Sequence, residues 1–309
     1  MKFVVTGGAG FIGSHIVEQL LDDGHTVTVI DNLNTGKLDN LSKVLAKIDF
    51  IQGDIRDTEL LKNIFKDTDG VFHEAALASV QESFSKVDEY NDVNVKGTEG
   101  ILRLAKEYGF KVVYASSSSV YGNPAKIPIH EDDPKNPINP YAQTKLDDEV
   151  LATKYAKDGV KVIGLRYFNV FGDRQSQQYA GVIKKFFKKA RSGEPPIING
   201  DGTQSRDFVF VGDVVNANIM AMKSSVDHAF FNIGTATTIS VNELAETIVA
   251  EFGLKLKPIH GPELPGDVHT TKADISLAKR LLGWEPRVDI REWIKEVIST
   301  KTNLDSIID

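Results

Sequence analysis

Residues 6–13 read Thr-Gly-Gly-Ala-Gly-Phe-Ile-Gly, and this stretch decides the fold. It follows an apolar, β-branched run, Lys2–Thr6, and opens a helical pattern, Ile12–Asp22. In such a turn one glycine allows the tight bend, one lets the backbone approach a pyrophosphate, and one lets the helix pack closely on the strand. The first N–H groups of the helix then face the phosphates with a partial positive charge. The stretch predicts a dinucleotide-binding turn, although many glycine-rich loops merely turn the chain.

Asp31 ends the second expected strand, 18 residues after Gly13. A carboxylate there can accept both ribose hydroxyls of an adenosine and would repel a 2′-phosphate. This favours NAD over NADP, although Lys37 lies near enough to keep NADP as an alternative. After the third strand, Asp54 and Ile55 could hold an adenine, one by its carboxylate and the other as an apolar wall. Taken alone, an aspartate at such a position is more often a helix cap or a turn residue.

The first half of the chain alternates short β-branched runs with longer helical patterns. The expected strands are Lys2–Thr6, Thr26–Ile30, Asp49–Gln52, Gly70–Glu74, Lys111–Ser116 and Lys161–Leu165. The expected helices between them are Ile12–Asp22, Thr58–Phe65, Val87–Tyr108 and Tyr141–Asp158. Apolar strands separated by helices indicate a parallel sheet covered on both faces, so we expect a doubly wound α/β (Rossmann) fold.

After about Leu165 the pattern is less regular, with Gly/Pro-containing loops at Gly193–Gly202 and Pro258–Gly266. The expected helices here are Asp213–Lys223, Val241–Phe252, Ser276–Leu282 and Ile290–Ser299. We expect a dinucleotide-binding domain over residues 1–165 and a smaller mixed α/β lobe over 166–309. A segment near 207–234, with a strand at Phe230–Ile233, is expected to return to the first domain. The cleft between the two is the expected ligand site.

The composition excludes several classes of function. With 41% apolar and 26% charged residues, the chain of 309 residues is typical of a soluble globular protein. Its net charge of −7, with both signs interspersed, gives no basic footprint for a nucleic acid. The absence of cysteine excludes disulfides, thiolate metal sites and cysteine nucleophiles, and no metal site is expected. No signal peptide and no apolar stretch of roughly 18 to 20 residues are found, so we expect a cytoplasmic protein without membrane contact.

The candidate catalytic residues lie on the helix after the fifth strand. Of the eight tyrosines, only Tyr141 has a lysine four residues later, Lys145, and residues four apart share a helix face. A phenol normally ionises near pH 10, and a neighbouring ammonium favours its ionised form. The serine run Ser116–Ser119, at the preceding strand end, can offer a hydroxyl to the same substrate oxygen. Taken alone, a tyrosine and a lysine at this spacing could equally be an exposed pair on a helix surface with no catalytic role.

Together these features resemble the extended short-chain dehydrogenase/reductase family, and within it the UDP-glucose (UDP-galactose) 4-epimerases, including forms that act on N-acetylated sugars. The resemblance covers nearly the whole chain. It is carried by the glycine turn, Asp31, the serine run, His73–Ala76, Asn94–Thr98, Ser116–Gly122, Pro140–Lys145, Arg166–Asn169 and Ser205–Asp207. It implies NAD that stays bound, a 4-keto sugar intermediate, and a homodimer formed through the helices Val87–Tyr108 and Tyr141–Asp158.

The resemblance also implies roles for single residues. Catalysis falls to Ser117, Tyr141 and Lys145, with Tyr141 taking the proton of the sugar 4-hydroxyl. The implied cofactor-binding residues are Gly7, Gly10, Phe11, Ile12, Gly13, Asp31, Asn32, Asp54, Ile55, Ala75, Asn94, Tyr141, Lys145 and Phe168. The implied substrate-binding residues are Ser117, Asn169, Val182, Ile197, Asn199, Arg206, Asp267 and Thr271. For Arg206 the alternative is a plain ion pair with Asp207.

Three departures bear on the reaction and its substrate. Similar dehydratases carry Asp-Glu after the catalytic serine, and related UDP-glucuronate decarboxylases usually carry a glutamate at the second of these positions, but this chain has Ser118-Ser119, which favours epimerisation. Leu264 stands where the family commonly has a second phosphate-binding arginine, with His269 a weak substitute. Thr271 stands where some members carry a bulky tyrosine, so we expect UDP-GlcNAc and UDP-GalNAc to be accepted beside the plain hexoses.

Other functions stay open on the same scaffold. A UDP-glucuronate 4-epimerase would need the same catalytic residues, whereas a nucleotide-sugar reductase would consume NADPH, which Asp31 disfavours. A protein that only senses a dinucleotide would keep the fold without the chemistry. The intact set of Ser117, Tyr141 and Lys145 argues against this last reading.

Overall fold

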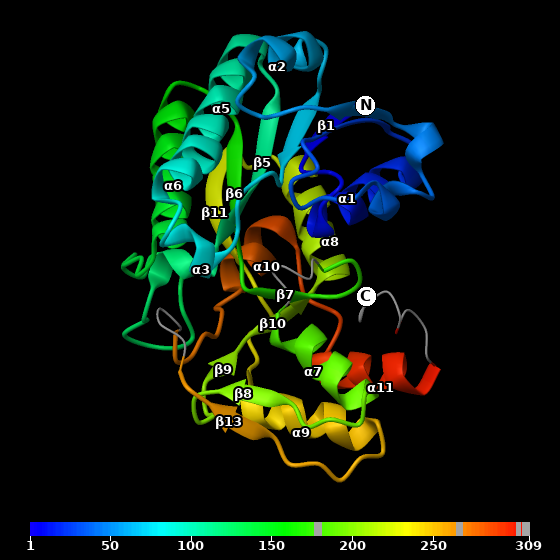
Figure 1. Ribbon diagram of the computed structural model, residues 1–309. Helices are drawn as coiled ribbons and strands as arrows, with labels where there is room; N and C mark the ends of the chain where they lie inside the picture. The colour runs from blue at the N-terminus through cyan, green and yellow to red at the C-terminus, as the bar shows by residue number, and fades with distance from the viewer. Residues whose placement is uncertain (176–180, 264–267, 301–303, 305–309) are drawn as a thin grey trace.

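A seven-stranded parallel sheet forms the centre of the N-terminal part of the computed structural model (Figure 1). The structure describes residues 1–175, 181–263, 268–300 and 304. The strand order is β11-β6-β5-β4-β1-β2-β3, and each neighbouring pair is parallel. The strands are β1 (Lys2–Thr6), β2 (Thr26–Asp31), β3 (Asp49–Gln52), β4 (Gly70–His73), β5 (Lys111–Ser117), β6 (Val162–Tyr167) and β11 (His228–Ile233). The expected doubly wound α/β fold is confirmed.

Helices cover both faces of this sheet. The helices of this part are α1 (Phe11–Asp22), α2 (Thr58–Phe65), α3 (Val80–Ser83), α4 (Val87–Tyr90), α5 (Gly97–Tyr108), α6 (Pro140–Lys157) and α8 (Val211–Lys223). Short 3-10 turns lie at η1 (Leu38–Leu41), η2 (Leu45–Lys47) and η4 (Ser118–Tyr121). Residues of α1 and α8 share one buried core with β1 and β2, whereas residues of α2, α5 and α6 share another. The segment near 207–234 thus supplies a helix and a sheet strand to the first domain.

The expected helix Val87–Tyr108 contains a π-helical turn, η3 (Asn91–Lys96), between α4 and α5. The Asn94 side chain inside this turn bonds both the N–H and the C=O of Leu77, at 2.8 and 3.0 Å. Such a local widening often marks a position where a helix meets a functional site. The apolar periodicity of the sequence predicts a helix here but carries no signal for the wider turn.

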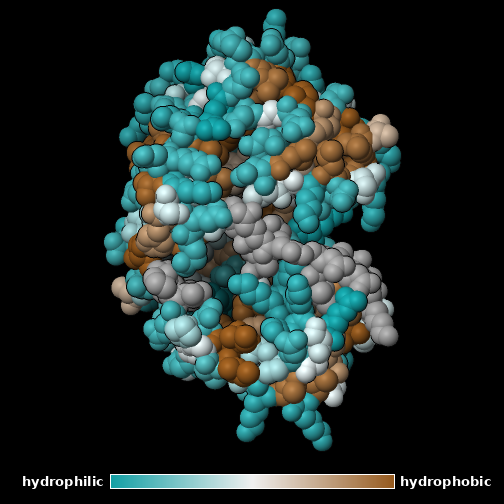
Figure 2. Space-filling view, viewed as in Figure 1, coloured by the Kyte–Doolittle hydropathy of each residue, from teal (hydrophilic) through white to brown (hydrophobic). Residues whose placement is uncertain are grey.

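The C-terminal lobe lies below the sheet in Figure 1 and has its own aromatic core. Its elements are β7 (Asn169–Phe171), α7 (Val182–Arg191), β8 (Ile197–Asn199), β9 (Ser205–Arg206), β10 (Phe208–Phe210), β12 (Ile239–Ser240), α9 (Val241–Glu251), β13 (Ile259–Gly261) and α11 (Ile290–Thr300). Helix α10 (Ser276–Leu282) instead packs on the first domain, against β11 and α8. Phe171 packs edge-on against Trp293, with ring centroids 5.0 Å apart. In Figure 2 polar residues cover most of the visible face, which is indented between the two lobes.

Two expectations for this lobe were wrong. The segments 193–202 and 258–266, expected as loops, contain β8 and β13, which pair in parallel with each other. Helix α7 was not expected, although Ile183, Phe186 and Phe187 recur at helical spacing between lysines and are all buried. Over the described ranges, none of the helices combines the length and the apolar character that crossing a bilayer requires.

Candidate active site

A cleft of about 940 Å³ opens at the carboxyl edge of the sheet. Its walls come from the glycine turn after β1, the loop after β2, the ends of β4, β5 and β6, and the first turns of α6. Ligands of open α/β sheets bind at this edge, where successive connections leave on opposite faces and a crevice forms. The fold therefore places the predicted dinucleotide turn and the predicted catalytic helix in one cleft.

The glycine turn admits no side chain at two of its positions. Gly7 has a left-handed backbone with φ of +69°, and a Cβ there would lie 2.6 Å from the Ala75 nitrogen. A Cβ on Gly13 would lie 2.2 Å from the Gly7 oxygen. No side chain caps the N-terminus of α1 at Gly10, so its N–H groups stay open toward the cleft. This cradle fits the pyrophosphate of a dinucleotide.

Asp31 lies at the end of β2 in the cleft wall and is 7% exposed. One carboxylate oxygen accepts the N–H of Ala9 at 2.9 Å, and the other accepts the N–H of Leu33 at 2.8 Å. Burial raises the pKa of this carboxyl, whereas the two N–H groups lower it. Each oxygen keeps a second lone pair, so the group fits a ribose diol.

The far end of the cleft is ionic, which the sequence reading missed. The guanidinium of Arg56 donates to both oxygens of Asp54, at 2.9 and 2.8 Å, and to Asp92 at 2.7 Å. These hydrogen bonds lower the pKa of Asp54 to about 2. Ile55 is buried in the same wall, and Asn32 donates to Asp54 at 3.4 Å. A ligand here would meet an aspartate that is already ionised and shared with an arginine.

The tyrosine–lysine pair lies at the start of α6, which Asn139 caps by accepting the N–H three residues on, at 2.8 Å. Tyr141 and Lys145 both line the cleft. The Lys145 ammonium donates to the backbone oxygen of Ala115 at 2.9 Å and lies 3.5 Å from a carboxylate oxygen of Asp148. The lysine is therefore fixed between the end of β5 and its own helix, beside the tyrosine.

Consecutive serines at the end of β5 face opposite sides, as strand geometry requires. Ser117 lines the cleft, and its hydroxyl oxygen accepts the N–H and the O–H of Ser119, at 3.2 and 2.9 Å. The hydroxyl of Ser116 instead donates to Glu149 at 2.7 Å, behind the strand. Both serines line the cleft, but the Ser116 hydroxyl is bonded to the buried Glu149, which leaves Ser117 as the candidate for a hydroxyl that touches substrate.

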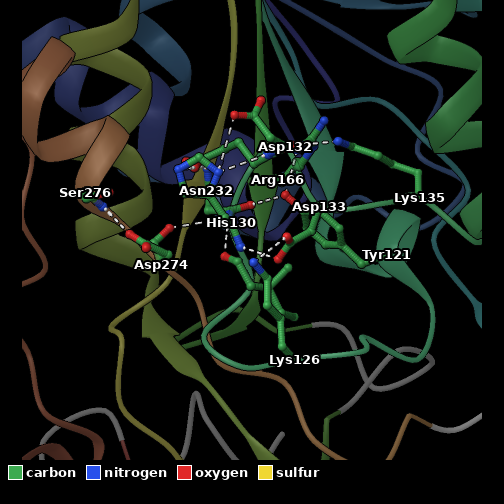
Figure 3. Close-up of polar contacts among 12 residues, drawn as sticks. Tyr121, Lys126, His130, Asp132, Asp133, Lys135, Arg166, Asn232, Asp274 and Ser276 are labelled. Carbon is green, nitrogen blue, oxygen red and sulfur yellow. Dashed lines mark hydrogen bonds and ion pairs between the residues drawn. The ribbon is translucent and has the colours of Figure 1, made fainter.

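A buried network supports this arrangement from behind, and we call Ser116, Tyr121, Glu149, Arg166 and Asn232 the paired cluster. Arg166, 2% exposed, donates two hydrogen bonds to Glu149, at 2.8 and 2.7 Å, and one to the Tyr121 hydroxyl at 2.6 Å. That hydroxyl donates to the Asn232 side chain at 2.7 Å. Figure 3 shows Tyr121, Arg166 and Asn232 pointing toward one another from different elements. The paired cluster ties η4, α6, β6 and β11 to the end of β5.

Glu74, directly after β4, is a cleft residue to which the sequence reading gave no role. Its carboxylate accepts the hydroxyl of Tyr167 at 2.9 Å, and that hydroxyl oxygen accepts the amide of Asn218 at 2.7 Å. Burial raises the pKa of Glu74 to about 7, while the Tyr167 hydrogen bond and the charge of Lys145 lower it. A charged residue at the end of an otherwise apolar strand was the signal in the sequence.

The remaining predicted cofactor residues fall into two groups. The cleft wall includes Phe11, Ile12, Ala75 and Phe168. Asn94 is 1% exposed and lies outside that wall, because its amide is engaged by Leu77 and by the Thr144 hydroxyl, at 3.0 Å. The structure therefore makes Asn94 a support for the wall and not a residue that borders a ligand.

Of the predicted substrate residues, Ser117 lines this cleft and the others in the described part of the chain do not. Asn169, Val182, Ile197, Asn199, Arg206 and Thr271 all lie in the C-terminal lobe and outside the described cleft lining. Arg206 donates to the backbone oxygens of Ser205 and His269, at 2.9 and 3.0 Å, and borders a separate pocket of about 210 Å³. Ile197 is 52% exposed. Asp267 and Leu264 lie outside the described residues.

Asp207, the alternative partner considered for Arg206, has a structural task. Its carboxylate accepts the N–H groups of Thr235, Ala236 and Ala273, at 2.6, 3.1 and 2.9 Å. These bonds fasten the loop after β11 to the strand that carries Arg206. The structure thus gathers the predicted catalytic residues and all predicted cofactor residues except Asn94, whereas the described substrate residues other than Ser117 are spread over the second lobe.

Comparison with known proteins agrees with this geometry. The family model described as the NAD dependent epimerase/dehydratase family matches residues 3–234. A relative from Methanocaldococcus jannaschii, provisionally named UDP-glucose 4-epimerase, is 42% identical, over 97% of this chain and 98% of its own. A relative from Thermodesulfobacterium geofontis named UDP-glucuronate 4-epimerase is 36% identical, over 99% of this chain and 98% of its own.

Two solved structures are similar along almost their whole length. UDP-glucose 4-epimerase from Thermotoga maritima, solved with UDP-glucose, has a TM-score of 0.92 and 37% identity, covering 97% of this chain and 98% of that one. UDP-N-acetylglucosamine 4-epimerase from Methanobrevibacter ruminantium, solved with UDP-N-acetylmuramic acid, has a TM-score of 0.91 and 38% identity, covering 96% and 97%. The chain belongs to the NAD-dependent epimerase/dehydratase family, and its cofactor is NAD.

Proposed function

We propose that this protein is a UDP-hexose 4-epimerase that interconverts UDP-glucose and UDP-galactose. The observation that carries the proposal is the meeting of Ser117, Tyr141 and Lys145 in the cleft that begins at the glycine turn. Relatives that act on UDP-sugars at C4, similar over almost the whole chain, support the reaction class.

The proposed chemistry assigns one task to each of the three side chains. Tyr141, as phenolate, takes the proton of the sugar 4-hydroxyl, and Ser117 donates a hydrogen bond to the same oxygen. Lys145, held by Ala115, favours the phenolate by its charge. NAD, when bound, supplies the acceptor and donor of the hydrogen at C4. After the 4-keto sugar turns over, Tyr141 returns its proton to the opposite stereoisomer.

The residues after Ser117 support epimerisation over elimination. Ser118 and Ser119 occupy η4, and the Ser119 hydroxyl is spent on Ser117 at 2.9 Å. Neither side chain can act as the acid–base pair that removal of water would need, because a hydroxyl is too weak an acid and base near neutral pH. Positions 118 and 119 therefore provide no acid or base that would eliminate water from the 4-keto sugar.

We propose further that N-acetylated sugars are accepted. Thr271 is 8% exposed, and its hydroxyl oxygen accepts the N–H of Asp207 at 3.5 Å, so the side chain is small and held back against its own lobe. A solved relative with 38% identity is named a UDP-N-acetylglucosamine 4-epimerase. Thr271→Tyr is the matched variant, and its bulk should lower turnover of UDP-GalNAc more than that of UDP-galactose.

The test is proton NMR of the purified protein, with no NAD added, after mixing with UDP-galactose, UDP-GalNAc or UDP-glucuronate in separate samples. New anomeric signals of the 4-epimers from the first two would support the proposal, and their relative rates would rank the sugars. Turnover of UDP-glucuronate alone would replace the proposal by a UDP-glucuronate 4-epimerase, and a need for added NADPH would replace it by a reductase.

A further inference from the structure

Asp148 is a buried carboxyl one helical turn after Lys145 and is 0% exposed. One of its oxygens lies 3.5 Å from the Lys145 ammonium. Within the described part of the chain, neither oxygen makes a hydrogen bond of good geometry. An acid that is buried with so few donors is costly, since ordinary buried carboxyls are fully hydrogen-bonded. Its single close charge is the ammonium that borders the cleft.

The side chains around Asp148 leave Lys145 as its natural partner. Thr98 on α5 donates its hydroxyl proton to the Asn94 oxygen at 2.6 Å and lies 2.9 Å from His73 on β4. His73 is fully buried, and desolvation lowers its pKa to about 3, so this ring stays neutral. The Thr98 hydroxyl gives its proton to Asn94, and its contact with Asp148 lowers the pKa of that carboxyl less than the Lys145 charge does.

The ionisable groups that face Asp148 come from three elements. Lys145 lies on its own helix, Tyr114 lies on β5, and His73 on β4 is reached through Thr98. Asp147 raises the pKa of Asp148 by its charge, although its side chain lies on the exposed side of α6. Burial raises the pKa of Asp148 to about 7, while the Lys145 charge lowers it. Tyr114 is buried and Asp148 is among the charges that raise its pKa, so this phenol stays neutral.

We propose that Asp148 is a positioning residue that holds the Lys145 ammonium at the cleft wall, one helical turn from Tyr141. The inference rests on the proposed function, because it takes Tyr141 as the reacting base. Asp148 does not touch substrate, and it acts only through the lysine.

The expected effect follows from the two anchors of the ammonium. Lys145 donates to the backbone oxygen of Ala115 at 2.9 Å and lies 3.5 Å from an Asp148 oxygen. Removing the carboxyl releases one of the two anchors, so the lysine is held less well beside Tyr141 and the maximal turnover should fall.

The experiment measures kcat and KM for UDP-galactose between pH 5 and 9 in holoenzyme with Asp148→Asn, Asp148→Glu and Asp147→Asn. In Asp148→Asn we expect kcat to be several-fold lower, with KM nearly unchanged. Asp147→Asn is the matched control, because Asp147 faces the helix surface and bonds Gln143 at 2.9 Å. Asp148→Glu, which keeps the carboxyl, should restore most of the wild-type kcat.

A kcat of Asp148→Asn equal to that of wild type would overturn the proposal. Should this variant not fold, Asp148→Ala removes the charge without leaving an amide to be satisfied, and the same comparison applies. A wild-type protein without epimerase activity would be a failure of the proposed function instead.

A second readout needs no turnover. Between pH 3.8 and about 7 the folded state keeps a proton on Asp148 that the unfolded state has released, so the free energy of unfolding falls as pH rises through this window. The amide introduced by Asp148→Asn does not titrate. The Tm of this variant should therefore gain on that of wild type from pH 5 to 8, while Asp147→Asn should show no such trend. A constant difference for Asp148→Asn contradicts a neutral acid held beside Lys145.

Discussion

Two buried ionic groups share helix α6 and differ in how completely they are paired. In the paired cluster, Arg166 and Glu149 meet through two hydrogen bonds, and Ser116 and Tyr121 bond the rest of their polar atoms. We call Lys145, Asp148, Glu74 and His73 the lysine cluster. There the carboxyls have few donors, and burial raises the pKa of both Asp148 and Glu74 to about 7.

The difference in pairing indicates different roles: the paired cluster stabilises the fold, and the lysine cluster serves the reaction. A buried ion pair with every polar atom satisfied holds one geometry, and breaking one partner strands a charge. Carboxyls with incomplete pairing change protonation near neutral pH, and groups of this kind gather at functional sites. The described lining of the cleft includes Ser116 alone from the paired cluster, whereas the lysine cluster contributes Lys145 and Glu74. Loss of a side chain should therefore affect stability in one cluster and pH-dependent activity in the other.

The largest expected effect is on turnover. Tyr141→Phe removes the proposed base, so kcat for UDP-galactose should fall about 10³-fold. The folded structure keeps its ring and loses only the hydroxyl, so the Tm should stay within about 2 °C of wild type. Kinetics by NMR and a thermal melt on the same preparation test both. If Tyr141→Phe keeps more than a tenth of wild-type kcat, Tyr141 is not the catalytic base.

The next effect is on stability. Glu149→Gln leaves the buried Arg166 charge without its counter-ion, and the free energy of unfolding should fall by about 3 to 5 kcal/mol. Urea unfolding measures it. The control is Glu243→Gln, which breaks the exposed pair of Glu243 with Arg291, whose side chains are 48% and 38% exposed, and should cost about 1 kcal/mol or less. If Glu149→Gln and Glu243→Gln lower the free energy of unfolding equally, the paired cluster does not stabilise the fold in the way proposed.

Ser116 and Ser117, neighbours on β5, should show the effect on stability and the effect on turnover separately. Ser117→Ala should lower kcat about 10- to 100-fold, because a hydrogen bond to the reacting oxygen is lost, with stability nearly unchanged. Ser116→Ala removes a donor from Glu149 and should cost about 1 to 2 kcal/mol of unfolding free energy, with kcat close to wild type. The reverse pattern, with Ser116→Ala inactive and Ser117→Ala unstable, would show that the strand faces are exchanged.

Sequence reasoning worked best where one side-chain pattern determines one geometry. The strands β1 and β3 were predicted to the residue, because each is a short run with apolar residues at its centre and a turn or loop at its end. Helix α7 was not predicted, although its apolar residues recur at helical spacing. The short β8 and β13 could not be predicted, because three-residue strands depend on a partner about 60 residues away in sequence.

The candidate site divides in the same way. Gly7, Gly13, Asp31 and Tyr141 sit in motifs whose spacing carries their geometry, and all line the cleft. Asp148, Arg166 and Glu74 belong to no spacing rule, since their importance comes from burial and from partners on other elements.

The smallest expected effect tests the lysine cluster at its second carboxyl. Glu74 has its pKa raised from 4.5 to about 7, so the folded state holds a proton that the unfolded state has released over this range. The free energy of unfolding of wild type therefore falls as pH rises from 4.5 through about 7. Glu74→Gln keeps an acceptor for Tyr167 and does not titrate, so it should gain on wild type by roughly 1 kcal/mol from pH 5 to 8, a value discounted because the group borders an open cleft. Chemical unfolding at both pH values measures the gain. Glu149→Gln leaves the buried Arg166 without its counter-ion, so at pH 8 it should lower the free energy of unfolding, whereas Glu74→Gln should raise it. A change of the same sign in both variants would show that the two clusters do not differ in role.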